Sequence, residues 1–328
     1  MAKPSGTINV AMAEAHPAAD APAPLDLLAF SHPACLDHDP GLGHPESPAR
    51  LAAVIDALNA ALPGLPWRDA PQALRSQLAR VHSSRLIADL LDRRVTDHHR
   101  IDADTVMSPH SHEAALRAAG AGIAAVDAIM AGECRRAFCA VRPPGHHASI
   151  DTAMGFCLFN SIAVTAAHGL DGHGLTRIAI ADFDVHHGNG SQDIFENDPR
   201  VLYLSSHQAP LYPGTGFRED RGVGNIFNAQ LPPRSGSSAF REAWANALLP
   251  AIDQFRPQLL LISAGFDGHR LEPLADLNLD TADYTWLSQQ LRQCAERHAE
   301  ARLISMLEGG YSLTALRECV VAHVRALI

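Results

Sequence analysis

The sequence lacks the features that mark membrane and secreted proteins. No stretch approaches the roughly 18 consecutive apolar residues that a membrane span requires, so we expect no membrane partner. Residues 1–24 are rich in Ala and Pro and include Glu14, His16 and Asp20, so they lack the apolar core of a secretory signal. We therefore expect a cytoplasmic protein. Residues 1–24 are predicted to form a flexible arm that could serve a contact in a homo-oligomer.

Cysteine spacing and basic charge exclude two further classes. The six cysteines contain no CxxC pair and no regular framework, which is typical of a chain in a reducing compartment. Only 26 Lys and Arg stand against 36 Asp and Glu, giving a net charge of −10. Nucleic-acid binding needs clustered basic residues, so we expect no such partner. The negative balance mildly favours cationic substrates.

What is present is an alternation of β-rich and helical segments. Apolar, β-rich runs occur at 25–30, 137–141, 178–183, 201–204, 259–263 and 303–307. Helical patterns begin at Ser47-Pro48 and cover 84–94, 109–131, 158–168, 191–196, 238–255, 281–299 and 312–327. Such alternation predicts an α/β fold with a mostly parallel sheet covered by helices on both faces. No linker interrupts residues 25–328, which we expect to form one domain.

Four of the predicted strands end in segments crowded with polar residues and glycine. These segments are 142–148 (RPPGHHA), 184–190 (DVHHGNG), 264–269 (AGFDGH) and 308–311 (EGGY). In open α/β sheets, ligands bind in the crevice beyond the carboxyl ends of the strands. The four segments therefore predict a single site at that edge of the sheet.

The second and third of these segments offer ligands for a metal ion. Asp182, Asp184 and His186 alternate along a segment predicted to be extended, so their side chains should leave the same face. With Asp267 from a later strand end, Asp184 and His186 would form a three-ligand site with an open position for water, as in catalytic zinc sites. An isolated DxH pair is more often a solvated turn, but its clustering with the other polar segments favours a metal site. The additional carboxylates that a second metal ion would need are absent, which indicates one ion.

Proton transfer and oxyanion stabilisation have candidates in the remaining segments. His146 and His147 follow a Pro-Pro-Gly turn, and adjacent histidines near a metal can take and return a proton. Asp182 and Asn189 could each orient one of them. Tyr311, after two glycines, could donate a hydrogen bond to a developing oxyanion. A lone histidine, or a GGY turn by itself, would be weak evidence for a catalytic role.

Together these segments resemble the histone deacetylase family, within the arginase–deacetylase fold. The motifs that carry the resemblance appear in the family's order, and the resemblance spans residues 25–328. They are RPPGHHA (142–148), GFCLFN (155–160), DFDVHHGNG (182–190), YPGTG (212–216), SAGFDGH (263–269) and LEGGY (307–311). The resemblance implies a three-layer α/β domain and a zinc-dependent amidohydrolase.

The resemblance also implies roles for individual residues. The implied zinc ligands are Asp184, His186 and Asp267, the tandem histidines are His146 and His147, and the carbonyl-polarising tyrosine is Tyr311. Gly155, Phe156 and Tyr212 match the lining of a narrow substrate channel, where Tyr212 replaces the usual Phe, and Cys157 is expected to pack beside it. A structural potassium ion would lie at Asp182, Asp184, His186 and Ser205. A second such site would use carbonyls of Phe195, Val201 and Phe227.

The resemblance is to the class II branch and its bacterial relatives, because Asn189 stands where class I members typically carry Asp. The implied reaction removes an acetyl or other short acyl group from an amine, most simply an N-acetyl-lysine side chain. Leu274 falls where polyamine-selective members that resemble this class carry an acidic gatekeeper, with Glu272 nearby. An acetylpolyamine amidohydrolase is the main alternative, and a non-catalytic module that binds acylated lysine is a second. The missing second-metal carboxylates disfavour an arginase.

Overall fold

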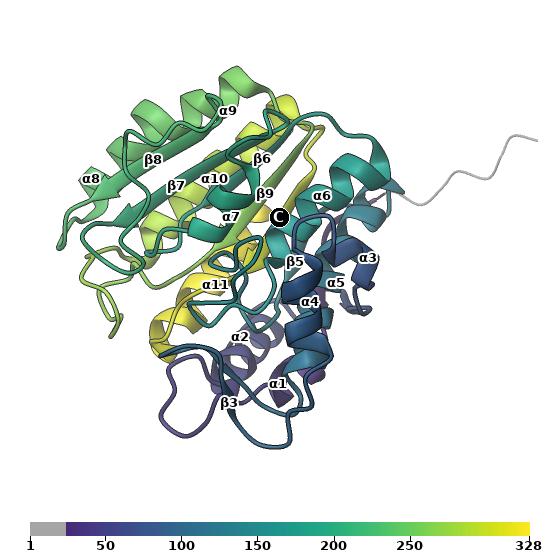
Figure 1. Ribbon diagram of the computed structural model, residues 1–328. Helices are drawn as coiled ribbons and strands as arrows, with labels where there is room; N and C mark the ends of the chain where they lie inside the picture. Colours follow the sequence, from purple (N-terminus) through teal and green to yellow (C-terminus); the bar gives the residue numbers. More distant parts are fainter. Residues whose placement is uncertain (1–23) are drawn as a thin grey trace, which may run out of the picture.

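The computed structural model describes residues 24–328 (Figure 1). The arm predicted at residues 1–24 lies outside the described residues apart from Pro24. The described chain forms one domain around an eight-stranded sheet whose strand pairs are all parallel. This arrangement confirms the predicted α/β class. None of the helices in the described part combines the length and apolarity that crossing a bilayer would take.

The sheet has the strand order β2-β1-β5-β10-β9-β6-β7-β8. Its strands are β1 Leu25–Ser31, β2 Trp67–Asp69, β5 Cys134–Cys139, β6 Ile178–Asp182, β7 Val201–Gln208, β8 Ile226–Leu231, β9 Leu259–Ala264 and β10 Leu303–Leu307. The central strands are wholly buried and read as continuous apolar runs, as expected for a parallel sheet covered on both faces. A separate two-stranded antiparallel pair joins β3 His99–Arg100 to β4 Val106–Met107.

Two groups of helices pack around the sheet (Figure 1). Helices α5 and α6 pack on each other and on central strands, while α10 packs on α11 and α11 on α2. The helices are α1 Ala34–Asp37, α2 Pro48–Ala61, α3 Arg75–Leu78, α4 Ser84–Leu91, α5 Ser111–Met130, α6 Ser161–His173, α7 Asn189–Phe195, α8 Ser237–Ala243, α9 Leu249–Phe255, α10 Thr281–His298 and α11 Leu313–Leu327. The helix predicted over 238–255 is divided by a π-helical turn, Trp244–Leu248, between α8 and α9.

The topology places the predicted site at a point where the strand order reverses. The chain leaves β6 for β7 on one side, whereas it leaves β9 for β10 on the other, and β6 and β9 are neighbours. Such a reversal opens a crevice beyond the carboxyl ends of the two strands. The four strands that precede the polar segments, β5, β10, β9 and β6, are adjacent in the sheet, so those segments lie side by side.

Candidate active site and metal centre

Three side chains converge at the crevice between β6 and β9. Nδ1 of His186 lies 3.1 Å from Oδ1 of Asp184 and 3.2 Å from Oδ2 of Asp267. The two carboxylates are fully buried, and His186 is 9% exposed. The separations are close to the edges of a tetrahedron of ligands at about 2.0–2.2 Å from one ion. Two buried carboxylates beside a single imidazole need a cation, so these residues fit a divalent metal ion.

Backbone amides hold two of these ligands, and one of the two contacts requires glycine. The Gly309 amide donates to Oδ2 of Asp184 (2.8 Å), and the Val185 amide donates to Oδ1 of Asp267 (2.9 Å). A Cβ on Gly309 would lie 2.1 Å from Oδ2 of Asp267, so only glycine lets the β10 loop approach this closely.

The expectation that Asp182, Asp184 and His186 lie along one extended strand was wrong. Strand β6 ends at Asp182, and the following residues form a bend that carries Asp184 and His186 to Asp267. Asp182 is directed elsewhere and does not join the group of three ligands. A buried bend can therefore bring together side chains that would lie one after another along the same face of an extended strand.

The two adjacent histidines have chemically different partners. Nδ1 of His146 lies 3.0 Å from Oδ2 of Asp182, which also accepts a hydrogen bond from the Tyr203 hydroxyl (3.0 Å). Nδ1 of His147 lies 2.8 Å from Oδ1 of the neutral Asn189. Burial alone lowers the pKa of His146, but the Asp184 and Asp182 carboxylates outweigh it and raise the pKa to about 10. Burial and the charges of His146 and His186 hold the pKa of His147 well below its ordinary value.

These groups open into a pocket of about 220 Å³. Its lining comprises Asp104, Pro144, His146, His147, Gly155, Phe156, His186, Leu211, Tyr212, Leu274, Gly309 and Tyr311. The imidazoles are buried, whereas Tyr212 and Leu274 are 38% and 37% exposed and so mark the opening. The Tyr212 ring lies 5.2 Å from that of His147, and the Phe156 ring 5.8 Å from that of Tyr311. Every channel residue expected from the sequence thus lines one pocket, and His186 of the metal group lines it as well.

Comparisons with known proteins decide the family. A model of the histone deacetylase domain matches residues 44–327. The chain belongs to the histone deacetylase family. It is similar to a histone deacetylase-like amidohydrolase of Pseudomonas aeruginosa, with 38% identity over 87% of this chain and 77% of that protein. It is also similar to a probable deacetylase of Archaeoglobus fulgidus, with 37% identity over 86% and 80% of the two chains.

A solved structure agrees with this assignment. The HD domain of HDA15 superposes with a TM-score of 0.87 and 32% identity, covering 92% of this chain and 88% of that one. Membership of the histone deacetylase family makes the chain a hydrolase of the deacetylase class.

Sequence reasoning missed a buried ionic cluster that supports the loops carrying His146 and Tyr311 in this deacetylase. Glu46 binds Arg50 (2.9 Å) and Arg142 (2.6 Å), and all three side chains are at most 1% exposed. Arg50 also donates to the carbonyls of Glu308 and Gly310, both at 2.6 Å, and its guanidinium lies 4.6 Å from the centre of the Tyr311 ring. Glu46 and Arg50, one turn apart at the start of α2, look in sequence like an ordinary surface pair.

Two glutamates for which the sequence predicted no catalytic or metal-binding role also bind the loops of the site. Oε2 of Glu308 accepts from the backbone amides of Gly145 (2.6 Å) and His146 (3.2 Å), so it fixes the loop that carries both histidines. Burial raises the pKa of Glu308 to about 7. Glu272 is buried and accepts from the Tyr311 amide (2.9 Å), away from the pocket that Leu274 lines. The LEGGY motif contained Glu308, but nothing in the sequence indicated which amides it binds.

The two groups of residues expected to bind potassium have different hydrogen-bond partners. Asp182 and Ser205 are paired in register on β6 and β7, and the Ser205 hydroxyl lies 2.9 Å from Nδ1 of His207. At the second position, the amide nitrogen of Asn225 donates to the carbonyls of Phe195 (2.7 Å) and Val201 (2.8 Å). It also donates to the Asp198 carbonyl at 3.0 Å. The carbonyls of Phe195 and Val201, expected from the sequence to bind a cation, therefore both accept from a side-chain amide.

Proposed function

We propose that this protein is a zinc-dependent hydrolase that removes acetyl or other short acyl groups from acylated amines, most simply N-acetyl-lysine side chains. The observation that carries the proposal is the convergence of Asp184, His186 and Asp267, of which His186 lines one pocket together with His146, His147 and Tyr311. A binding module would need no such combination of metal ligands, proton carriers and a phenol. The intact set therefore favours catalysis.

The reaction follows from what each group can do. Asp184, His186 and Asp267 would hold zinc, which when bound would supply Lewis acidity for the acyl carbonyl and for the attacking water. The Tyr311 hydroxyl donates to the carbonyl oxygen as negative charge develops there, and burial keeps the pKa of Tyr311 well above its ordinary value, so the phenol stays protonated. A histidine accepts the proton of the attacking water, and a protonated histidine then gives a proton to the leaving amine.

The two histidines divide this work according to their partners. The Asp182 carboxylate favours a positive His146, whereas the neutral Asn189 amide leaves His147 uncharged and free to accept a proton. We therefore assign the general base to His147 and an electrostatic role to His146. Protonated His147 then donates its proton to the leaving amine, so no other residue is needed as the general acid.

The pocket entrance favours acyl-lysine over acylpolyamine. A polyamine carries positive charge beyond the acylated nitrogen, and a carboxylate at the entrance would stabilise that charge. The entrance has Leu274, while Glu272 is buried and bound to the Tyr311 amide. Asp104 is a carboxylate of the lining that lies outside the metal group, and it keeps an acetylpolyamine as the second candidate substrate.

Turnover of the zinc-loaded enzyme on acetyl-lysine peptides and on acetylspermidine tests this assignment. The expected result is a higher kcat/KM for the peptides, reversed or narrowed in Leu274→Glu but not in the matched Leu274→Gln. Faster hydrolysis of acetylspermidine by the unaltered enzyme would assign acetylpolyamines, and not acetyl-lysine peptides, as the preferred substrate class. No hydrolysis of either substrate by the zinc-loaded enzyme would contradict the proposed function.

We also propose one structural potassium ion, at Asp182, Asp184, His186 and Ser205. The second position of the family, near Phe195, Val201 and Phe227, is in our proposal taken by the Asn225 amide. The side-chain nitrogen of Asn225 lies within 2.7–3.0 Å of three converging carbonyls, those of Phe195, Asp198 and Val201, which supports this replacement.

A further inference from the structure

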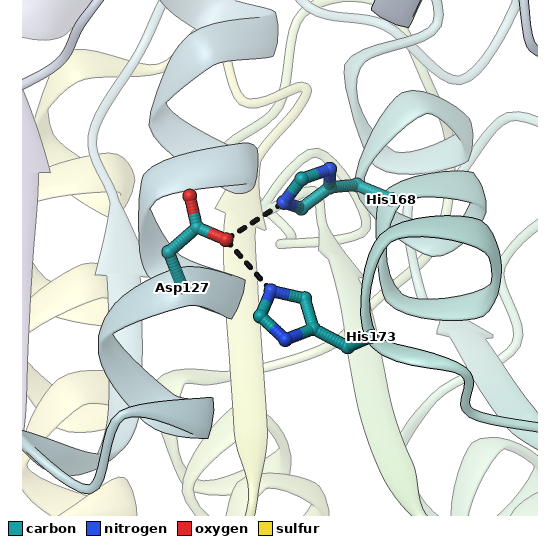
Figure 2. A group of neighbouring side chains, drawn as sticks. All are labelled: Asp127, His168 and His173. Carbon is teal, nitrogen blue, oxygen red and sulfur yellow. Dashed lines mark hydrogen bonds and ion pairs between the residues drawn. The ribbon is translucent and has the colours of Figure 1, made fainter.

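A second group of metal-ligand side chains lies outside the active site, between helices α5 and α6. Asp127 belongs to α5, and His168 and His173 belong to α6. Oδ1 of Asp127 lies 2.7 Å from Nε2 of His168 and 2.7 Å from Nε2 of His173. Figure 2 shows both rings directing a nitrogen at the same carboxylate oxygen. Within residues 24–328, this group and the catalytic one are the two that bring three such ligand atoms together.

The group is remote from the catalytic residues. Helix α6 begins after Asn160, whose amide donates to the carbonyls of His146 (3.4 Å) and Ala148 (3.0 Å). The helix has 13 residues and ends at His173, a length of about 20 Å at the rise of an α-helix. His173 therefore lies at the opposite end of α6 from the loop that carries His146, and we expect substitutions at His173 to leave that loop in place.

The donor set suits a divalent ion of borderline softness. Two imidazole nitrogens and one carboxylate are ligands that Zn²⁺ and its neighbours prefer. With bonds of about 2.0–2.1 Å, tetrahedral ligands lie about 3.3 Å apart, so each nitrogen–oxygen pair must open by about 0.6 Å. The Asp127 side chain is 54% exposed and can move by this amount, and solvent can supply the remaining ligand.

When no metal is bound, Arg80 determines which ring nitrogen of His168 carries the proton. Its guanidinium lies 2.9 Å from Nδ1 of His168. Because a guanidinium only donates, Nδ1 of His168 must accept, and the ring proton must lie on Nε2, directed at Asp127. An ion on Nε2 requires that proton to move to Nδ1, which ends the hydrogen bond from Arg80. Arg80 and the ion therefore compete for His168.

We propose that Asp127, His168 and His173 form a second site for a divalent transition metal ion of the Zn²⁺ class, which ties α5 to α6. When the ion binds, it takes the place of the Nε2 protons now directed at Asp127, and the single ring proton of each histidine moves from Nε2 to Nδ1. This site is independent of the proposed hydrolase function.

Metal stoichiometry tests the site directly. The full-length zinc-loaded enzyme is dialysed against Zn²⁺ at free concentrations set by a chelator buffer, and bound zinc is measured by elemental analysis. The unaltered chain is expected to bind a second equivalent, which His173→Gln and Asp127→Asn should lose while retaining the first. Gln keeps a donor for Asp127 but offers no imidazole, so the helix contact survives. In Arg80→Met, the second affinity should rise by about two- to fivefold, as expected for removing one exposed competing charge.

Two controls separate this site from others. His298 contacts Asp253 at 2.8 Å without a second imidazole, so His298→Gln should keep both equivalents. Replacing Asp184 and Asp267 together by Asn should remove the first equivalent and leave the second. The proposal is overturned if His173→Gln binds as much zinc as the unaltered chain, or if Arg80→Met binds the second ion no more tightly.

Discussion

Replacing Tyr311 by Phe removes one hydroxyl and little else. The ring would keep its contact with the Arg50 guanidinium, 4.6 Å from its centre, and its edge contact with Phe156 at 5.8 Å. The backbone amide would still donate to Glu272. Loss of one donor to a developing oxyanion costs about 10²–10³ in kcat, or about 2.7–4 kcal/mol of transition-state stabilisation. We expect a loss in that range with KM changed far less, because the hydrogen bond strengthens mainly in the transition state.

The assay is steady-state hydrolysis of an acetyl-lysine peptide by zinc-loaded enzyme, with zinc content measured on the same sample. Tyr212→Phe is the matched control, since it removes a phenol hydroxyl from the same pocket at a position 38% exposed. That control should stay within about tenfold of the unaltered enzyme, as for loss of an ordinary hydrogen bond. A Tyr311→Phe enzyme with full zinc and undiminished kcat would refute the assigned role.

Three further predictions follow from buried groups. Glu308→Gln should lower kcat by about 10- to 100-fold with KM little changed, because the histidine loop loses the carboxylate that binds its amides. Glu308→Asp should recover none of this loss, because its shorter side chain does not reach the amides of Gly145 and His146. An unchanged kcat in both variants would exclude a positioning role. His323 is buried, and burial lowers its pKa to about 3. The neutral ring therefore stabilises the folded state above pH 6.5, and this stability falls by about 1.4 kcal/mol per pH unit as the pH drops below that value. In urea unfolding, His323→Gln should lose less free energy of unfolding between pH 7 and 5 than the unaltered chain, and an equal loss would contradict the assignment. Asn225→Ala should make thermal stability depend on potassium near Phe195, and a midpoint indifferent to potassium in this variant would argue against the Asn225 replacement.

The sequence predicted the sheet because its central strands are buried on both faces. Strands β6, β9 and β10 appear as apolar runs bounded by polar turns, and the helices between them have a clear period. Strand β8 was missed because Asn228 and Gln230 interrupt its apolar character at the sheet edge. Strand β2 has only three residues, too few for a period. The short pairing of β3 with β4 leaves no pattern for the same reason.

The residue types of the site could be predicted, but their convergence depends on tertiary contacts. Asp184 and His186 reach Asp267 through a bend after β6, not through alternation along a strand. The buried cluster joins Glu46 and Arg50, which are 4 residues apart, to Arg142, which is 96 residues from Glu46, and its members carry no local signal of burial. The two residues expected to orient the histidines each contact one of them, Asp182 at His146 and Asn189 at His147, and both flank the motif that contains the candidate metal ligands.

Removal and return of the metal tests the central claim most directly. Enzyme dialysed against a chelator until elemental analysis finds no zinc should not hydrolyse acetyl-lysine peptide, and one equivalent of Zn²⁺ should restore turnover. The Asp267→Asn enzyme should neither retain that equivalent nor recover. Full turnover by protein shown to contain no metal would contradict the assignment of Asp184, His186 and Asp267 as the ligands of a catalytic ion.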